Sequence, residues 1–292
     1  MLKAYLKDGK AWTERFLATA LTSPCEEYNG LYESMKYSLM MGGKRIRPIL
    51  TKAVMESLGV DPEPYKEIVC AIELIHTYSL IHDDLPAMDN DDYRRGNLTN
   101  HKVYGDGMAI LAGDGLNTFA FELMGQNTVA TAEQKNAAIV ALAKAAGPSG
   151  MVGGQAFDLS SEGHNLSLKE LQVLHKGKTG ALFLGAIEIG LILANAAPHI
   201  CEKYRAYGDQ LGLLFQITDD ILDVTGTIED LGKMPGSDEK MHKATYVSIL
   251  GEAEARKKAE EVGQLAKAAL SDIDGDISIL TGLVDYLLHR TN

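Results

Sequence analysis

The spacing of apolar residues is the feature that most limits how this chain can fold. Its hydrophobic segments repeat at intervals of three and four residues, which places apolar side chains on one face of an α-helix. The clearest segments are 33–40, 53–60, 67–82, 135–146, 180–197 and 207–224. Glycine and proline fall between them, as expected of breakers between helices. No convincing alternating strand is present, so the pattern predicts an all-α bundle.

The same pattern predicts one domain. No change of composition, Ser/Gly linker, low-complexity tract or regular repeat divides the 292 residues, and a hydrophobic content of 46% can supply a sizeable core. We therefore expect residues 1–292 to fold as a single unit. Several of these segments are apolar on more than one face, which is typical of helices inside a bundle or at a subunit interface. Oligomerisation is an expectation from this feature.

Charge and cysteine content limit the partners and the compartment. Lys and Arg number 28 against 40 Asp and Glu, and the net charge of −12 argues against general nucleic-acid binding and against anionic membrane surfaces. Cys25, Cys70 and Cys201 are odd in number and widely spaced, which favours a reducing compartment over a disulfide framework or a zinc site. The N-terminus does not resemble a signal peptide, and no apolar run reaches the roughly 18 residues that span a bilayer. We expect a soluble cytoplasmic protein without membrane insertion.

The stretch "SLIHDDLPAMDNDDYRRG" joins an apolar helix to a dense acidic run. His76 and Asp83 are seven residues apart and share a helical face, while Asp84 lies a quarter-turn round. Pro86 interrupts the helix, so Asp89 can return toward Asp83. A solvated helix end is the ordinary explanation of such a run. Carboxylates at a helix C-terminus oppose the helix dipole and each other, however, and this favours a bound cation.

A second acidic segment, "FQITDDILDV", strengthens the metal hypothesis. Asp219 and Asp223 are four residues apart on one face, with Asp220 and Gln216 inside the same arc. One such cluster could equally be neutralised by Arg or Lys on a neighbouring helix. Two clusters favour an all-oxygen Mg²⁺ site, because Mg²⁺ typically binds through one or two carboxylates together with substrate phosphates.

The basic residues that phosphate oxygens would require also occur in clusters. In "MGGKRIRPIL" two glycines free the backbone, and Lys44 and Arg47 lie three residues apart at a helix start. Arg94 and Arg95 follow the first acidic run directly, and a guanidinium matches phosphate bidentately. A lone basic tetrapeptide would be a solvated surface. Two basic clusters beside two acidic ones suggest two diphosphates, one held by metal and one by side chains.

The motifs "GGKRIRP", "HDDLPAMDNDDYRRG", "GGQAFDL", "KTGAL" and "FQITDDILD" followed by "GK" occur in this order between Gly42 and Tyr246. Together they resemble the trans-prenyl diphosphate synthases, most of all the bacterial farnesyl diphosphate synthases. The resemblance implies a single polyprenyl synthase domain of the isoprenoid synthase type, an all-α bundle around a deep central cavity, usually homodimeric. It implies Mg²⁺-dependent head-to-tail condensation of isopentenyl diphosphate with dimethylallyl or geranyl diphosphate, giving (2E,6E)-farnesyl diphosphate and diphosphate in isoprenoid biosynthesis.

The resemblance also assigns roles to residues. Several Mg²⁺ ions, some arriving with the substrate diphosphate, would be ligated by Asp83, Asp84, Asp89 and Asp219, supported by Asp220 and Asp223. Isopentenyl diphosphate would be held by Lys44, Arg47, His76 and Arg95. The allylic diphosphate would be engaged by Arg94, Lys178, Thr179, Gln216 and Lys233. The catalytic group would comprise Asp83, Asp84, Asp89, Arg94, Lys178, Asp219 and Asp220.

These roles agree with the chemistry of the reaction. Breaking the allylic C–O bond leaves negative charge on the diphosphate, which metal ions stabilise, and the resulting cation needs a dry apolar cavity. That need explains why the acidic motifs end apolar helices. The stretch "IEDLGKMPGSDEKMHKATY" resembles a lid that would bring Lys233 and Lys243 inward.

Product length depends on fewer residues. In the family the residues four and five before the first aspartate, here Ser79 and Tyr78, help set the cavity floor, and the bulk of Tyr78 predicts a C15 product. The C20 product geranylgeranyl diphosphate is the alternative, because apolar pockets discriminate poorly per methylene. Tyr78 could also pack on a neighbouring helix with the floor elsewhere.

Rival functions predict different residues. A class I terpene cyclase would not need the intact "GGKRIRP", and a non-catalytic subunit of a heteromeric synthase would be expected to lack aspartates or basic residues that are present here. A His/Asp metallohydrolase would need further histidine ligands. Leu98 and Val247 stand where the family commonly has proline, which concerns loop rigidity. The C-terminal "LLHRTN" resembles the family's basic tail only loosely, leaving little support for Arg290 as a residue that closes the site.

Overall fold

The computed structural model describes residues 1–164, 166–225 and 244–290. Its α-helices are α1 (Leu2–Ala20), α2 (Asn29–Met40), α3 (Ile46–Ser57), α4 (Lys66–Asp83), α5 (Asn100–Tyr104), α6 (Asp106–Gln126), α7 (Ala132–Ala146), α8 (Met151–Ser160), α9 (Leu168–His175), α10 (Ala181–Leu193), α11 (Pro198–Thr225), α14 (Tyr246–Leu250), α15 (Glu252–Ala269) and α16 (Ser278–His289). Short 3₁₀ turns occupy Glu26–Tyr28 and Glu63–Tyr65, and a π-helix, η3, occupies Lys176–Gly180. The predicted all-α fold is confirmed.

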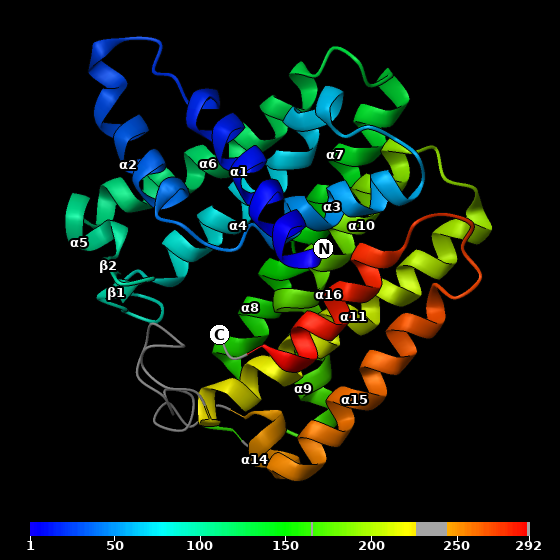
Figure 1. Cartoon of the computed structure of the whole chain (residues 1–292). Coiled ribbons are helices and arrows are strands. Elements are labelled where there is room, and N and C mark those ends of the chain that lie inside the picture. Colours follow the sequence, from blue (N-terminus) through cyan, green and yellow to red (C-terminus); the bar gives the residue numbers. More distant parts are fainter. Residues whose placement is uncertain (165, 226–243, 291–292) are drawn as a thin grey trace.

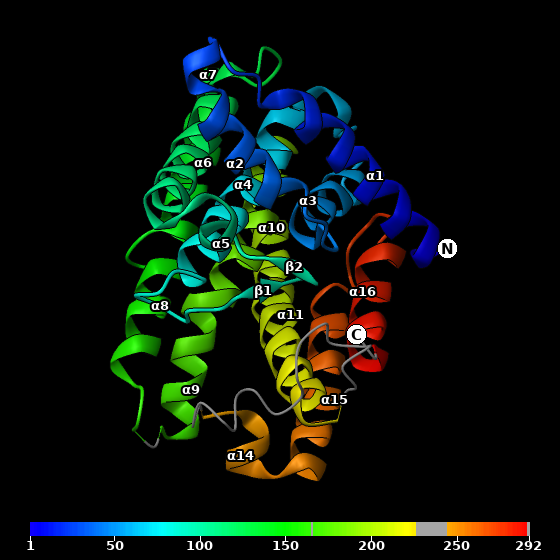
Figure 2. The same cartoon turned by 90° about the vertical axis from the view of Figure 1, so that its left-hand side faces the viewer.

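The helices pack together as a bundle, as Figure 1 shows. Helix α10 packs against α3, α4, α7 and α11, while α4 packs along α6. In Figure 2, α6, α8 and α9 lie along one side, α1, α15 and α16 lie along the other, and α10 and α11 run between them. Most side chains of α4 and α10 are buried, as predicted from segments apolar on more than one face.

One small departure from the sequence prediction lies beside the first acidic run. Strands β1 (Tyr93–Arg94) and β2 (Asn97–Leu98) form an antiparallel hairpin of two residues each. Its turn residues, Arg95 and Gly96, have φ values of 53° and 76°. Hairpins with a two-residue turn favour positive φ at both turn positions. This hairpin therefore depends on the conformation of its turn and not on alternating hydrophobic residues in its strands. The hairpin sends Arg94 and Arg95 in different directions.

The prediction that the chain does not insert into a membrane can be compared with the length and apolarity of its helices. None of the helices in the described part of the chain is both long enough and apolar enough to cross a bilayer.

Candidate active site

The first acidic motif lies where α4 ends. Asp83 is the last residue of the helix and Asp84 is its C-cap. The chain then turns back, because the backbone N–H of Asp89 donates to the Asp83 carbonyl at 2.9 Å and that of Asn90 donates to the Leu85 carbonyl at 3.1 Å. Asn90 takes up the positive φ of 52° that this turn needs. The predicted return of Asp89 toward Asp83 is confirmed.

Asp84 is engaged by the hairpin. It is buried, and Arg94 donates to it from Nη2 at 2.6 Å and from Nε at 2.7 and 3.0 Å. Burial raises the pKa of the Asp84 carboxyl, and the Arg94 contacts oppose that rise. Burial likewise acts against the charge of Arg94, but the pairing raises the pKa of Arg94. A bidentate pair of this kind fixes both side chains.

Asp83 has no comparable ion pair with any described residue, and its pKa is perturbed. Burial raises its pKa to about 6, the charge of Lys178 opposes the rise, and the charge of Asp89 adds to it. Lys178 belongs to η3 and donates to Asp158 of α8 at 2.6 Å. Lys178 therefore brings a positive charge of the protein itself to both Asp158 of α8 and Asp83 at the end of α4.

The position of Lys178 depends on a close approach of two helices. Gly154 of α8 lies against Gly177 of η3, and a Cβ at Gly154 would lie 2.0 Å from the Lys178 backbone nitrogen. No side chain fits that gap. Single π-helical turns are frequent at functional sites, and this one carries both Lys178 and Thr179.

The second acidic motif lies in α11, and its residues differ in exposure. Gln216, Asp220 and Asp223 are buried, whereas the Asp219 side chain is 56% exposed. Asp220 accepts a hydrogen bond from the Tyr246 backbone nitrogen at 2.6 Å, at the start of α14. The shared arc predicted from sequence thus contains carboxylates in different environments.

Arg290, just after α16, holds Asp219. Its Nη2 donates to the Asp219 carboxylate at 3.2 Å, to the Thr218 hydroxyl at 3.0 Å and to the Phe215 carbonyl at 3.0 Å. The guanidinium also lies 4.4 Å from the centre of the Phe215 ring. The sequence offered only a loose tail resemblance for this residue, and the contacts come from folding.

The basic residues come from four parts of the chain. Lys44 lies in the loop before α3, Arg47 in α3, His76 in α4 and Arg95 in the hairpin turn, where its Nη1 donates to the Gly42 carbonyl. Burial lowers the pKa of Arg47 to about 10. Burial, followed by the charge of Arg47, lowers the pKa of His76 well below its usual value. His76 is therefore neutral at neutral pH.

Lys44 links this basic group to the second acidic motif. Burial and the charge of Arg290 lower the pKa of Lys44, while the charge of Asp219 raises it. The Lys44 ammonium therefore lies near enough to Asp219 for their charges to interact, which brings the glycine-rich loop close to the second motif.

Comparison with known proteins decides the family. The model for "Polyprenyl synthetase" matches residues 28–276. The chain belongs to the polyprenyl synthetase family. A farnesyl diphosphate synthase of Geobacillus stearothermophilus is 45% identical, covering 93% of each chain. A chloroplastic geranylgeranyl pyrophosphate synthase of Capsicum annuum is 44% identical over 91% of this chain and 73% of its own. A solved FPP/GFPP synthase from Zymomonas mobilis superposes with a TM-score of 0.88 at 37% identity, covering 98% of both chains.

The carboxylates of this polyprenyl synthetase fit Mg²⁺ that arrives with phosphate. Among the described residues, no three His, Cys, Asp or Glu side chains are grouped closely enough to hold a metal ion by themselves. Mg²⁺ needs only one or two carboxylates when phosphate oxygens and waters complete its shell. The oxygen-only donors of Asp83, Asp84, Asp89 and Asp219 match that chemistry.

Two predicted chain-length residues lie one turn before Asp83. Tyr78 is 8% exposed, and its ring meets that of His82 edge-on at 5.7 Å. Ser79 is half-buried, and its hydroxyl donates to the His76 carbonyl at 2.9 Å. Lys233, Lys243 and most of the predicted lid fall within 226–243, outside the described residues.

Sequence reasoning about the polyprenyl synthetase missed Arg45, Glu73 and Asp158. Arg45 is buried in an ion pair with Glu73, and Asp158 receives Lys178. A run of three basic residues in four positions could have indicated that one of them turns inward. Glu73 carried a signal as a lone charge inside an otherwise apolar helical segment.

Proposed function

We propose that this polyprenyl synthetase condenses isopentenyl diphosphate with dimethylallyl or geranyl diphosphate to give (2E,6E)-farnesyl diphosphate and inorganic diphosphate. The observation that carries the proposal is the presence of two chemically different groups of side chains, which we assign to the two halves of one site. Carboxylates end α4 and line α11, while a separate cationic group gathers around Arg47, His76 and Arg95. One half suits a diphosphate that brings metal, and the other suits a diphosphate held by side chains.

The allylic diphosphate belongs to the acidic half in this proposal. Asp83, Asp84, Asp89 and Asp219 would hold Mg²⁺, which supplies Lewis-acid stabilisation of the leaving diphosphate. Lys178 and Arg94 contribute fixed positive charge at the same place, and neither needs to move far, since Asp158 and Asp84 already hold them. Gln216, Thr179 and Lys233 are proposed to complete the contacts, and Asp220 and Asp223 to support the motif.

Isopentenyl diphosphate belongs to the basic half. Lys44, Arg47 and Arg95 would bind its phosphate oxygens, and neutral His76 would donate or accept one hydrogen bond without adding charge. The double bond then attacks C1 of the allylic group as its C–O bond breaks. A proton leaves C2 of the isopentenyl unit for an oxygen of the departing diphosphate. Buried apolar side chains of α4 and α6 keep water away from the cation.

We assign the C15 product on the position of Tyr78, five residues before Asp83 on the same helix. A bulky, buried ring there would end an apolar cavity that extended from the first motif along α4. Relatives named for different product lengths resemble this chain to a similar degree. Geranylgeranyl diphosphate is therefore the alternative product.

We further propose that residues 1–292 form one domain and that two chains pair as a homodimer. The family match and the continuous buried core support one domain. Exposed apolar side chains on consecutive helices α5 and α6 support pairing: Val103 is 45% exposed, Ile110 44% and Leu111 54%. All three cysteines are free, which agrees with a reducing compartment such as the cytoplasm. Light scattering of the purified protein tests the dimer.

The function is tested by product analysis. Purified protein, Mg²⁺ and isopentenyl diphosphate are incubated separately with dimethylallyl, geranyl and farnesyl diphosphates, with an Asp83→Ala variant and an EDTA-treated sample as controls. Accumulation of C15, with farnesyl diphosphate left unextended, supports the proposal, whereas C20 supports the alternative. Absence of elongation in every mixture would leave a non-catalytic subunit of a heteromeric synthase.

A further inference from the structure

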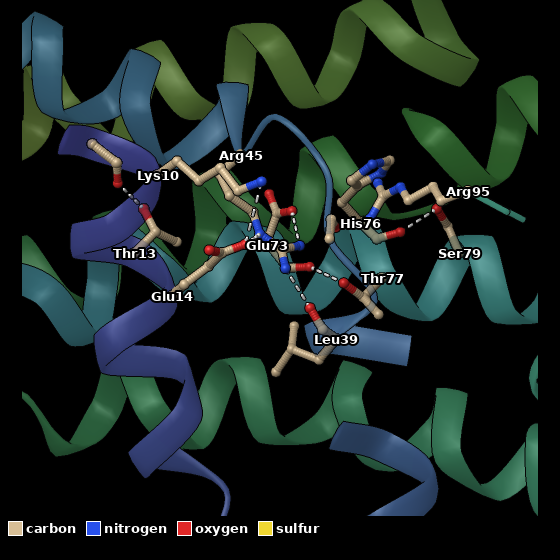
Figure 3. A network of polar contacts seen from close by, with 12 residues as sticks. Lys10, Thr13, Glu14, Leu39, Arg45, Glu73, His76, Thr77, Ser79 and Arg95 are labelled. Atoms are coloured by element: carbon tan, nitrogen blue, oxygen red, sulfur yellow. Dashed lines mark hydrogen bonds and ion pairs between the residues drawn. The ribbon is translucent and has the colours of Figure 1, made fainter. Parts of the chain in front are cut away.

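The middle cation of "GGKRIRP" does not face the basic half of the site. Arg45 has a φ of 53°, in the left-handed region that a non-glycine residue rarely adopts. Its guanidinium is completely buried and donates to Glu73 Oε1 at 2.9 Å, to Glu14 Oε1 at 3.3 Å and to the Leu39 carbonyl at 2.6 Å. Every nitrogen of the fork has a partner. Figure 3 shows this network, with Arg45 beside Glu14, Glu73 and Leu39.

Glu73 lies between the network and the basic half. It is 1% exposed on α4, one helical turn before His76. Its Oε1 accepts from Arg45, while its buried Oε2 has no hydrogen-bond partner in the described part of the chain. An unpaired buried carboxylate oxygen is unfavourable unless positive charge lies nearby. That charge is present, because the Glu73 carboxylate offsets the burial that lowers the pKa of Arg47 and the pKa of Arg95.

We propose that the Arg45–Glu73 ion pair positions the residues that bind isopentenyl diphosphate. Arg45 fixes the loop that carries Lys44 and leads into the first turn of α3, which carries Arg47. Glu73 supplies the buried negative charge that lets Arg45, Arg47 and Arg95 lie close together before the diphosphate arrives. Neither side chain of the pair touches substrate. The inference rests on the proposed function for the identity of the ligand.

Energetics favour a positioning role over a purely stabilising one. A buried ion pair contributes little net stability, because desolvation of two charges consumes most of their attraction, and apolar replacements are often as stable. Removing one partner alone is strongly destabilising, since it leaves a buried charge unpaired. The pair also holds a left-handed residue in a loop whose preceding glycines have φ values of 101° and 120°. A constrained loop presents Lys44 and Arg47 with less conformational freedom to lose on binding.

The sign of the effect separates positioning from electrostatics. Glu73→Gln keeps the shape and removes the negative charge. If only charge mattered, the Glu73→Gln variant should bind a diphosphate more tightly than wild type, because its site is more positive. Loss of positioning predicts the opposite. We expect the KM and the calorimetric Kd of isopentenyl diphosphate to rise about tenfold or more, with the KM of the allylic substrate and kcat changing less than about threefold.

A double variant keeps stability apart from positioning. Arg45→Met together with Glu73→Met should unfold at nearly the wild-type temperature and still bind isopentenyl diphosphate weakly. Glu188→Gln, which breaks an ion pair with Arg205 elsewhere, is the matched control and should leave the Kd unchanged. An unchanged or lower Kd in Glu73→Gln, or recovery of the Kd with stability in the double variant, overturns the proposal. Calorimetry needs no turnover, so absence of elongation would overturn the proposed function separately.

Discussion

Replacing Asp83 with asparagine should abolish activity and yet stabilise the metal-free protein. Burial raises the pKa of Asp83 from 3.8 to about 6, so the fold disfavours its ionised form. One pKa unit corresponds to about 1.4 kcal/mol, and the full shift to about 3 kcal/mol. Because the Asp83 side chain is only half-buried, solvent screening makes its free-energy contribution smaller than this. We expect Asp83→Asn to raise the free energy of unfolding by about 1 to 3 kcal/mol at pH 8.

The gain should depend on pH with a defined sign. Because the folded pKa lies above the unfolded value, the folded protein keeps the proton longer. The stability associated with protonated Asp83 is fully present below pH 3.8 and is lost as the pH rises through about 6. The difference between variant and wild type should therefore be smaller at pH 5 than at pH 8.

Urea unfolding in EDTA at both pH values measures the effect. Asp84→Asn is the control, because it also loses a carboxylate of the motif but takes away the charge that holds the half-buried Arg94 fork. It should lower the free energy of unfolding by about 1 to 3 kcal/mol. Asp83→Asn that is less stable than wild type at pH 8, or a gain of equal size at pH 5, would refute the reasoning.

Three other substitutions test separate parts of the site. Tyr78→Ala should shift the product from C15 to C20 or longer in product analysis, and an unchanged C15 product would put the cavity floor elsewhere. Arg290→Leu frees Asp219 and should raise the Mg²⁺ concentration for half-maximal activity about tenfold, so an unaltered Mg²⁺ titration would contradict its role. Gly113→Ala brings a Cβ within 2.1 Å of His82 Nε2, and overpacking should cost about 1 to 3 kcal/mol in urea unfolding. A wild-type unfolding midpoint would contradict that expectation.

Local spacing was enough to predict the elements and the location of the chemistry. The intervals of three and four residues predicted the helices, and the end of α4 at Asp83 follows from the composition around Pro86. The return of Asp89 was also local, since it needs only a turn between Asp83 and Asp89. The hairpin of Arg94 and Arg95 was not predicted, because two-residue strands are too short to show alternation.

The functions of individual charges needed the tertiary structure. Lys44, Arg45 and Arg47 are equivalent cations in the sequence, and only the position of Glu73, 28 residues away from Arg45, turns Arg45 into the core. Asp219 and Asp220 are neighbours of identical chemistry. Asp219 is bound by Arg290, 71 residues further along the chain, and Asp220 by the backbone of Tyr246, 26 residues further along.

The sequence by itself determined that this chain is a helical bundle in which acidic motifs end apolar helices, because periodicity and helix termination depend on near neighbours along the chain. Only the tertiary structure decided which charges face the site and which hold it together. A charged side chain becomes a ligand or an anchor according to what surrounds it, and those surroundings are brought together by distant packing.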